Sequence, residues 1–423
     1  MPAAPGGMRA FVQMGATRDG LDPYLDCARR RDLPAVLVET PAYLRWRGVL
    51  GRRGFDVQVG VEHPDDPRQV LAALADRGIR PALVLAGFER YAPSAFALAR
   101  LLGVPPSPGA GPDFVPMDKR EQRALLTRRA PRIHQPGYVC WQGGPAFDDA
   151  VAALRFPQVV KPADGGGGLG VFLVHDAAQR ARALRAVRAT RNYDGGTFAG
   201  ILVEEYIAGV EYSIQGLAHA GQALVLSVCE KLTAQEPAVG DTGLRGFREL
   251  GHIGTHGACA DPALPAIAQQ CLAAVGYREG PFHIDVIGGA GYTFVEMGFR
   301  LSGGGLVGLV ENVTGVNWAE LAFRLHLDGE PPRLPPPGSP PRVVGQVTVV
   351  DESEFAAAAA LGRRRGVKVH RGTPAPADAD PARDPRLASD RMRHTGIGRV
   401  VLGGALDEVR AGLRRCVAGR LTD

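Results

Sequence analysis

The chain has 423 residues, of which 45% are hydrophobic, so it is long enough for two or three domains with substantial cores. Its formal net charge is +5, but the arginines are spread along the whole chain and no basic stripe alternates with aromatic residues. We interpret this charge as a solvated surface, and we expect no nucleic-acid partner.

The cysteines and the first residues predict a cytoplasmic protein. The six cysteines form neither CxxC pairs nor the dense pattern of a disulfide scaffold, which fits a reducing compartment. Residues 1–8 lack the charged and apolar regions of a secretory signal. No apolar stretch of the sequence is long enough to cross a bilayer, so we expect no membrane partner.

The first segment of the chain alternates between apolar runs and stretches with helical spacing. This pattern predicts a small parallel sheet with helices on both faces. The turn at residues 15–20 lacks GxGxxG spacing, so we do not expect dinucleotide binding. A stretch rich in proline and glycine, residues 103–116, marks a boundary. The predicted strands are at 8–14, 35–38, 55–61 and 81–85, and helical spacing occurs at 21–31 and 67–77.

A helix is predicted after this boundary, with Asp118 as its N-cap. Lys119 and Arg123 are four residues apart, so they share one face of this helix. That face points either at a phosphate or at water. Taken alone, the two residues favour the solvated interpretation.

The most informative stretch is FPQVVKPADGGGGLGVFLV, residues 156–174. An apolar run ends in Lys161, a glycine-rich turn follows, and a second apolar run begins at Val171, which predicts strand, loop and strand. The glycines let backbone N–H groups approach an anion, and Lys161 adds positive charge, so a polyphosphate is the expected ligand. The alternative is an ordinary flexible hairpin loop. The stretch is not a Walker A motif, because no Gly-Lys-Ser/Thr follows the glycines.

Carboxylates interrupt an apolar pattern in residues 201–216, ILVEEYIAGVEYSIQG. Glu204 and Glu205 lie near the end of one predicted strand, and Glu211 lies on the strand after it. Carboxylates beside a hydrophobic strand end are costly unless they meet hydrogen-bond donors. An adenine amino group and ribose hydroxyls would supply such donors. Pairing with arginine across strands is the alternative.

Residues 281–305 predict a hairpin with Asp285 on its first strand and Glu296 on its second. Two carboxylates opposed on adjacent strands repel each other. A divalent cation that bridges them to phosphates would reverse that cost, which is the usual arrangement for magnesium. Arg300 follows, in a position to clamp an anion with two hydrogen bonds. The segment from Ser302 to Gly305 lets backbone come close to a ligand.

Lysine is rare in this chain. Of the 49 basic residues only Lys119, Lys161, Lys231 and Lys368 are lysine. A lysine kept against such a bias can mark a site that needs a compact ammonium, and chance is the alternative. Three of the four lie near the segments predicted to bind a nucleotide. No role follows for Lys368.

The last part of the chain predicts a small α/β unit. A proline-rich linker at 331–341 is too stiff to be core. Strands are predicted at 343–350 and 400–402, helices at 354–361 and 405–421, and a loop at 374–385.

Together these motifs resemble the ATP-grasp superfamily. Their order is a lysine on a basic helix, VVKP with a glycine loop, VEEYIAGVEYS, HID and FVEMGFRLSGGG. Each motif alone is weak, whereas the ordered set is specific. The resemblance covers about residues 112–325. It implies an α/β protein with two α+β lobes that grip ATP, preceded by a Rossmann-like pre-ATP-grasp domain and followed by a small α/β cap.

The resemblance implies the following division of the chain. The pre-ATP-grasp domain is expected at 1–111, the small lobe at 112–207, the large lobe at 208–330, the linker at 331–341 and the C-terminal subdomain at 342–423.

It also implies an ATP-binding set, matched position by position. Lys119 and Lys161 resemble the lysines that contact the phosphates. The loop over the phosphates comprises Gly165, Gly166, Gly167, Gly168 and Gly170. The adenine-binding hinge comprises Glu204, Glu205, Tyr206 and Ile207, and Glu211 matches the ribose-binding carboxylate.

Asp285 and Glu296 match the magnesium ligands, with Mn²⁺ as an alternative metal, and Arg300 matches the arginine that stabilises the acyl phosphate. The chain departs from the common E-x-N-x-R form, because Gly298 stands where an asparagine ligand is usual. Water or a bidentate Glu296 would have to replace that ligand. Activity is still expected, with the number of metal ions left open.

A narrower resemblance rests on residues 247–252, FRELGH. They are similar to the E-x-G-H element of bacterial L-amino-acid ligases, which also lack the asparagine. There the glutamate, here Glu249, faces an amino-acid ammonium, and the histidine, here His252, lies near the reacting carboxylate. A helix-end glutamate and a packed histidine are the alternative. Lys231 is counted with the ATP-binding residues, and it begins a polar loop that ends near Asp241 and is expected to close over the site.

The expected activity is an ATP-dependent carboxylate–amine ligase that forms a peptide or amide bond through an acyl phosphate. Its partners would be a small-molecule carboxylate and an amine, in a homodimer. One alternative is a carboxylating or purine-type ATP-grasp enzyme, although no biotin-attachment Met-Lys-Met occurs. Another is a nucleotide-binding regulator that does not turn over.

Overall fold

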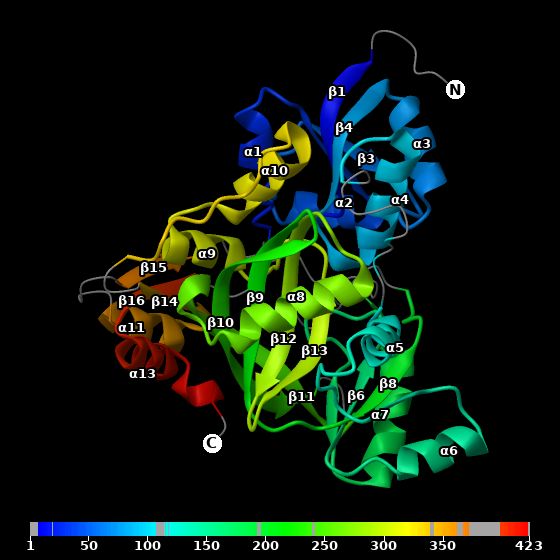
Figure 1. The fold of residues 1–423 in the computed structure, drawn as a ribbon, viewed down its shortest axis with the longest axis vertical. Helices are drawn as coiled ribbons and strands as arrows, with labels where there is room; N and C mark the ends of the chain where they lie inside the picture. The colour runs from blue at the N-terminus through cyan, green and yellow to red at the C-terminus, as the bar shows by residue number, and fades with distance from the viewer. Residues whose placement is uncertain are drawn as a thin grey trace.

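Two sheets organise the computed structural model, which describes residues 7–18, 20–106, 114, 116, 118–192, 196–238, 242–338, 342–361, 367–371 and 398–421. Within these residues, a four-stranded parallel sheet forms the N-terminal domain and a twelve-stranded antiparallel sheet runs through the rest (Figure 1). None of the helices in this part of the chain has the length and apolar character needed to span a bilayer.

The N-terminal domain confirms the predicted parallel sheet with helices on both faces. Its strand order is β3-β2-β1-β4. Alternate residues of β1 point to opposite faces, so Val12 packs with α3 and α4 while Phe11 packs with α1 and with α10 from the large lobe. The elements are β1 (Met8–Met14), α1 (Leu25–Arg29), β2 (Ala35–Glu39), α2 (Pro41–Val49), β3 (Val57–Gly60), α3 (Pro67–Ala75), β4 (Ile79–Ala86), a 3₁₀ turn η1 (Glu89–Tyr91) and α4 (Ala92–Leu102).

The antiparallel sheet joins a small and a large lobe, and its main path is β13-β12-β9-β10-β11-β7-β6-β8-β5. The small lobe contains β5 (Tyr138–Cys140), α6 (Pro145–Ala152), β6 (Gln158–Pro162), β7 (Phe172–Val174), α7 (Ala177–Ala189) and β8 (Ile201–Glu205). The large lobe contains β9 (Val210–His219), β10 (Gln222–Pro237), β11 (Arg245–His256), α8 (Ala263–Val275), β12 (Gly280–Gly288), β13 (Tyr292–Gly298), α9 (Leu306–Thr314) and α10 (Trp318–Asp328). The predicted strand, loop and strand around the glycine-rich turn are confirmed by β6 and β7.

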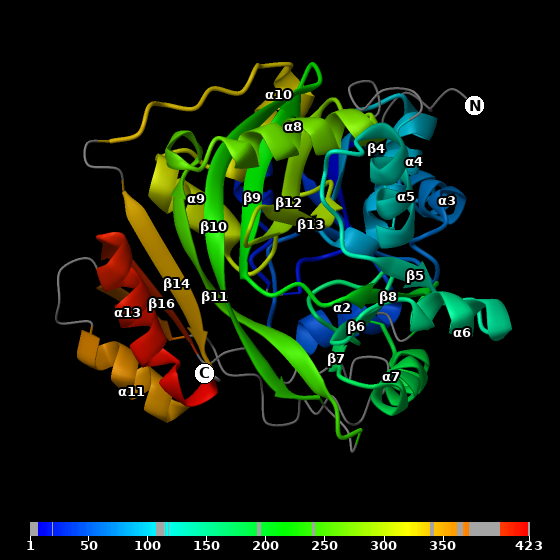
Figure 2. The ribbon, with the colours of Figure 1, turned by 60° about the horizontal axis from the view of Figure 1, so that its bottom comes forward.

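Two long strands connect the lobes. Figure 2 shows β10 and β11 curving from the large lobe to the small lobe, where Arg245 and Gly246 pair with β7. The predicted loop between Lys231 and Asp241 is therefore wrong up to Pro237, because residues 231–237 continue β10. Leu232 and Ala234 are buried on one side of this strand, and its backbone is hydrogen-bonded to β11. These contacts stabilise a strand although the segment is rich in polar residues. Asp241 lies outside the described residues.

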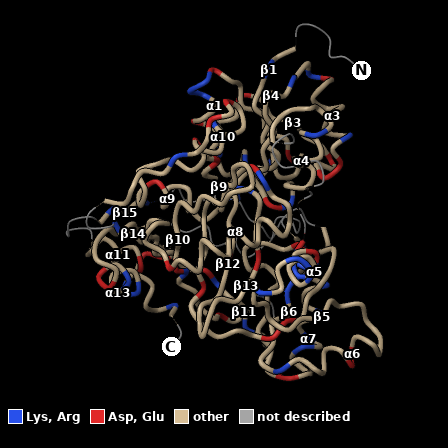
Figure 3. The backbone as a smooth tube through the Cα atoms, viewed as in Figure 1, with Lys and Arg blue, Asp and Glu red and all other residues tan. Residues whose placement is uncertain are grey.

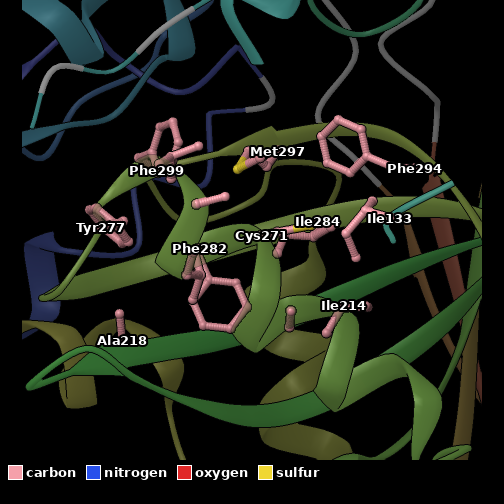
Figure 4. Packing of buried hydrophobic residues seen from close by; sticks show 14 of the residues in the cluster. Ile133, Ile214, Ala218, Cys271, Tyr277, Phe282, Ile284, Phe294, Met297 and Phe299 are labelled. Carbon is pink, nitrogen blue, oxygen red and sulfur yellow. The ribbon is translucent and has the colours of Figure 1, made fainter. Parts of the chain in front are cut away.

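The core of the large lobe explains which side chains are left for a site. On β12, Phe282, Ile284 and Val286 are buried in one cluster under α8, part of which is drawn in Figure 4. The period of two in a strand then places His283 and Asp285 on the opposite face. The same cluster includes Leu126 of α5 (Lys119–Arg129), the helix predicted after Asp118, which caps it as predicted.

The C-terminal subdomain extends the sheet through β14 (Val343–Val349), which pairs with β11. Its predicted strands and helices are present as β14, α11 (Glu352–Leu361), β16 (Gly398–Gly404) and α13 (Leu406–Cys416). Strand β15 (Val367–Arg371), which pairs with β16, was not predicted. The predicted loop at 374–385 lies outside the described residues. The boundaries of the proposed division remain a proposal, and α5 packs on α8 and β13 of the large lobe although it was assigned to the small lobe.

Charged residues of both signs occur in every part of the fold (Figure 3). In Figure 3 no lobe carries a single sign only.

Candidate active site

A cavity of about 1660 Å³ lies where the N-terminal domain, both lobes and the C-terminal subdomain meet. Its walls include Gly165–Gly168 of the glycine-rich loop and the end of β8 with Tyr206 and Ile207. The predicted phosphate-binding, adenine-binding and metal-binding segments thus border one space. Among the predicted residues that line it are Lys119, Lys161, Glu204, Glu205, Glu211, Lys231, Glu249, Asp285, Glu296 and Arg300.

Lys119 connects the two lobes across this cavity. Its Nζ donates a hydrogen bond to the Gly165 carbonyl at 2.5 Å and lies 2.9 Å from Glu296 Oε2. Arg123, one turn later, is fully buried and donates to the carbonyls of Phe294 and Val295. The solvated interpretation of this helix face is therefore wrong. The residues point inward because the face packs on β13.

Glu204 lies between two cations. Its carboxylate is 2.7 Å from Lys161 Nζ and 2.9 Å from the Arg123 guanidinium, and it is buried. Burial acts to raise the pKa of Glu204, but the charges of Arg123 and Lys161 outweigh burial and lower it to about 2. The pKa of Lys161 is also lowered, in its case chiefly because burial disfavours the charged ammonium. Glu204 therefore does not need the nucleotide donors that were predicted for it, because Lys161 and Arg123 already supply them.

This burial predicts a sharp contrast between Glu204→Gln and Glu205→Gln in stability. Glu204→Gln leaves two buried cations without their anion, which is expected to lower the free energy of unfolding at pH 7 by about 3–5 kcal/mol. Glu205 instead pairs at 3.1 Å with Arg155, whose side chain is 86% exposed, so its loss should cost under about 1 kcal/mol. Urea unfolding of both variants measures the difference.

The pH dependence has a defined sign. The pKa of Glu204 is lowered from its ordinary 4.5 to about 2, so its ionised form stabilises the fold above pH 4.5. That contribution, about 3 kcal/mol, is lost as the pH falls from 4.5 to about 2. A Glu204→Gln protein should therefore lose less stability over this window than the unsubstituted protein. An equal loss in both would contradict the assignment.

Lys231 lies within a group of carboxylates. Its Nζ is 2.5 Å from Asp285 Oδ2, 2.7 Å from Glu211 Oε1 and 3.7 Å from Glu249 Oε2. Burial works against its charge, but the three carboxylates outweigh burial and raise the pKa of Lys231 well above its ordinary value. Ser213 donates to the other oxygen of Asp285 at 2.6 Å. Lys231 therefore binds residues predicted for metal, ribose and substrate at once.

Asp285 and Glu296 are opposed across β12 and β13, as predicted. Each carboxylate is neutralised by a lysine, Asp285 by Lys231 and Glu296 by Lys119. In the described part of the chain no three His, Cys, Asp or Glu side chains gather as a complete metal site. Two carboxylates on one face fit a magnesium ion that takes its other ligands from phosphates and water. The residues present therefore fit the expected metal.

The space beside Gly298, where an asparagine side chain would lie, is already filled. A Cβ atom on Gly298 would collide with the His283 ring and lie 2.8 Å from Glu89 Oε2. Glu89 comes from η1 of the N-terminal domain and pairs with Arg300 at 2.8 Å. Because residue 298 has no side chain, the Glu89 carboxylate of the N-terminal domain can lie in this space. No motif marks Glu89, so the sequence reasoning missed it.

Gly298→Asn is accordingly expected to damage the protein rather than restore a metal ligand. The added side chain would overpack the contact between Gly298, His283 and Glu89, which should lower the free energy of unfolding by about 1–3 kcal/mol. Turnover with magnesium should also fall. The control is Gly291→Asn in the same hairpin, where an added Cβ meets nothing within 4 Å. Thermal unfolding and a magnesium titration of both variants test this. A stable Gly298→Asn protein with higher activity would contradict it.

Glu249 and His252 lie on strand β11, so the helix-end alternative for Glu249 is wrong. Glu249 Oε1 is 3.4 Å from His252 Nε2, and a Cβ on Gly304 would lie 3.4 Å from the same Oε1. The His252 side chain is buried. The structure thus brings the E-x-G-H element to Lys231 and to the glycines that follow Arg300. The catalytic roles of Glu249 and His252 stay predictions.

Comparisons with known proteins agree with this arrangement. The model of the ATP-grasp domain family matches residues 154–306. Dapdiamide A synthase of Enterobacter agglomerans is 27% identical over 164 residues, which cover 38% of this chain and 37% of that protein. Carnosine synthase 1 of Gallus gallus is 27% identical over 364 residues, which cover 78% of this chain and 35% of that protein. The chain therefore spans little more than a third of the length of these two relatives.

The fold is also known from solved structures. The L-amino acid ligase from Bacillus licheniformis superposes with a TM-score of 0.65 and 18% identity, covering 97% of both chains. At this identity the likeness concerns the fold. The chain therefore contains an ATP-grasp domain and has the ATP-grasp fold.

Proposed function

We propose that this chain is an ATP-dependent carboxylate–amine ligase that joins amino-acid substrates through an acyl phosphate and releases ADP and phosphate. The observation that carries the proposal is one cavity that is lined both by Lys119, Lys161 and Arg300 and by the opposed pair Asp285 and Glu296. Such a set supplies cations for a polyphosphate and a carboxylate, and oxygen ligands for a divalent ion. The relatives named as synthases and the solved L-amino acid ligase support it.

The two lysines are held in place by groups of the protein itself. Glu204 fixes Lys161, and Glu296 with the Gly165 carbonyl fixes Lys119. Groups that are already oriented toward developing charge need little rearrangement during reaction, and this is the main source of electrostatic catalysis. We propose that both ammonium groups contact the phosphates of ATP, under backbone amides of residues 165–170.

The remaining nucleotide contacts follow from the residues that line the cavity. We propose that backbone of Glu205, Tyr206 and Ile207 binds adenine and that Glu211 accepts hydrogen bonds from ribose. The Tyr206 ring stacks on Phe247 of β11 with centroids 6.1 Å apart, which closes this end of the cavity. Phe247 had no predicted role, because its partner Tyr206, which follows β8, is distant in the sequence.

In the proposed reaction a carboxylate oxygen attacks the γ-phosphorus of ATP, and the bond to ADP breaks with its electron pair going to ADP. The amine then attacks the acyl carbon, phosphate leaves, and the amine proton passes to a base or to that phosphate. Asp285 and Glu296 would hold magnesium, or manganese as an alternative, which neutralises phosphate charge when bound. Arg300 orients the carboxylate and the acyl phosphate.

Glu249 is proposed to hold an amino-acid ammonium, and His252, in contact with it, to lie near the reacting carboxylate. Water must be kept from the acyl phosphate, because hydrolysis would waste the intermediate. The N-terminal domain helps to close the cavity by placing Glu89 against Arg300.

The test incubates the protein with ATP, magnesium and pairs of the twenty standard amino acids, and measures ADP and phosphate. Amine-dependent release, and a hydroxamate when hydroxylamine replaces the amine, are expected. Release that needs bicarbonate would favour a carboxylating enzyme, and ATP binding without turnover would favour a regulator. Lys161→Met should abolish hydroxamate formation. The matched control is Lys368→Met, because Lys368 is exposed on β15 outside the cavity.

We also propose a homodimer in a reducing cytoplasm. Supporting the compartment, the six cysteines are all free thiols in the structure. Light scattering of the purified protein measures the assembly.

A further inference from the structure

The C-terminal subdomain is continuous with the strand that carries Glu249 and His252. Strand β14 pairs with β11, and Gln346 lies opposite His252 in that pairing. Strand β16 then pairs with β14, and β15 with β16. Backbone hydrogen bonds therefore fix the position of this subdomain relative to the proposed amino-acid site.

One face of this three-stranded extension lines the cavity. Val347 and Val400, which are register partners, pack in a buried cluster with α11 and α13. The next residues along each strand face the other way, and they form a row in which Arg399 lies between Thr348 and His370. Thr348, His370 and Arg399 all line the cavity.

Arg399 also contacts the glycine loop that follows Arg300. A Cβ atom on Gly305 would collide with the Arg399 guanidinium, and Gly304 accepts a hydrogen bond from Gln346 at 2.8 Å. On the same loop, a Cβ on Gly304 would meet Glu249. Arg399 and Glu249 therefore approach consecutive glycines, so a cation and a carboxylate border the same part of the cavity.

The described residues of this subdomain that line the cavity include basic side chains and no acidic ones. Among the basic residues, Arg371 pairs with Glu352 and Arg420 with Glu354. Helix α9, packed against the same face, contributes one acidic lining residue, Glu311, which accepts a hydrogen bond from Asn317 at 3.0 Å. Arg399 is the basic residue whose guanidinium a Cβ on Gly305 would strike.

We propose that Arg399 binds the carboxylate of the amine substrate, so that this substrate is an amino acid with a free carboxylate. The inference rests on the proposed ligase function and names the acceptor class of that site. A guanidinium binds a carboxylate through two parallel hydrogen bonds, which also orients it. With its carboxylate held by the C-terminal subdomain, the acceptor presents its amine toward the acyl phosphate beside Arg300.

The test compares acceptors that differ only at the carboxylate. Each standard L-amino acid and its carboxamide is assayed as acceptor, with the donor carboxylate identified by hydroxamate formation. The unsubstituted protein should prefer the acid. Arg399→Gln should lower the selectivity for acid over carboxamide, measured as the ratio of kcat/KM values, by about 30-fold or more. Arg399→Lys keeps the positive charge but not the two parallel N–H donors of the guanidinium, so it should lose less of this selectivity than Arg399→Gln.

The control is Arg414→Gln, because Arg414 is exposed on α13 of the same subdomain, and it should keep the selectivity. If Arg399→Gln lowers both acceptors equally, Arg399 only braces the Gly305 loop and the inference is overturned. No preference for the acid in the unsubstituted protein would overturn it as well. Absence of any hydroxamate would instead refute the ligase proposal itself, so the two failures are distinguishable.

Discussion

Lys231→Met is expected to lower the free energy of unfolding by about 3–5 kcal/mol in magnesium-free buffer at pH 7. The ammonium lies 2.5 Å from Asp285, which is buried, and 2.7 Å from Glu211, which is half-buried. Methionine has a similar length but no charge, so it leaves these like charges facing each other without a cation. Urea unfolding of the variant and of the unsubstituted protein measures the loss.

Magnesium should reverse part of this loss. With the ammonium removed, the carboxylates are available to a divalent cation, so the ion should stabilise Lys231→Met more than the unsubstituted protein. Lys368→Met is the matched control, and neither its stability nor its response to magnesium should change. A Lys231→Met protein as stable as the control would show that the carboxylates are solvated or protonated without Lys231.

Glu296→Gln is expected to lower kcat/KM for ATP by about 10³-fold or more. Several kcal/mol of charge stabilisation depend on a metal ion held at the phosphates, and each 1.4 kcal/mol is tenfold in rate. Burial acts to raise the pKa of Glu296, but Lys119 and the more distant Lys231 and Lys161 lower it to about 2, so the carboxylate is ionised at neutral pH. Glutamine keeps the shape and removes the charge.

A second readout separates metal binding from general damage. Titration calorimetry of ATP with and without magnesium should show that Glu296→Gln loses most of the magnesium dependence of ATP binding. Glu408→Gln, on the exposed side of α13, should bind and turn over ATP as the unsubstituted protein does. If Glu296→Gln kept its magnesium dependence, Glu296 would serve only to hold Lys119.

Local patterns in the sequence determined most of the elements and one central contact. Asp118 caps its helix because the cap depends on residues within one turn. The opposition of Asp285 and Glu296 follows from a short hairpin, whose turn fixes the register of its two strands. The alternation along β12 likewise sends Asp285 away from the core. These features depend on residues close together in the chain.

Contacts between distant segments were decided only by the tertiary structure. Glu204 meets Arg123, and Glu89 meets Arg300, across separations of 81 and 211 residues. Arg399 reaches the Gly305 loop from β16, which joins the sheet only through β14. No local spacing encodes such pairs, because they depend on how whole lobes pack. Sequence therefore determined which side chains leave each strand toward the cavity, and packing determined which partner each one meets there.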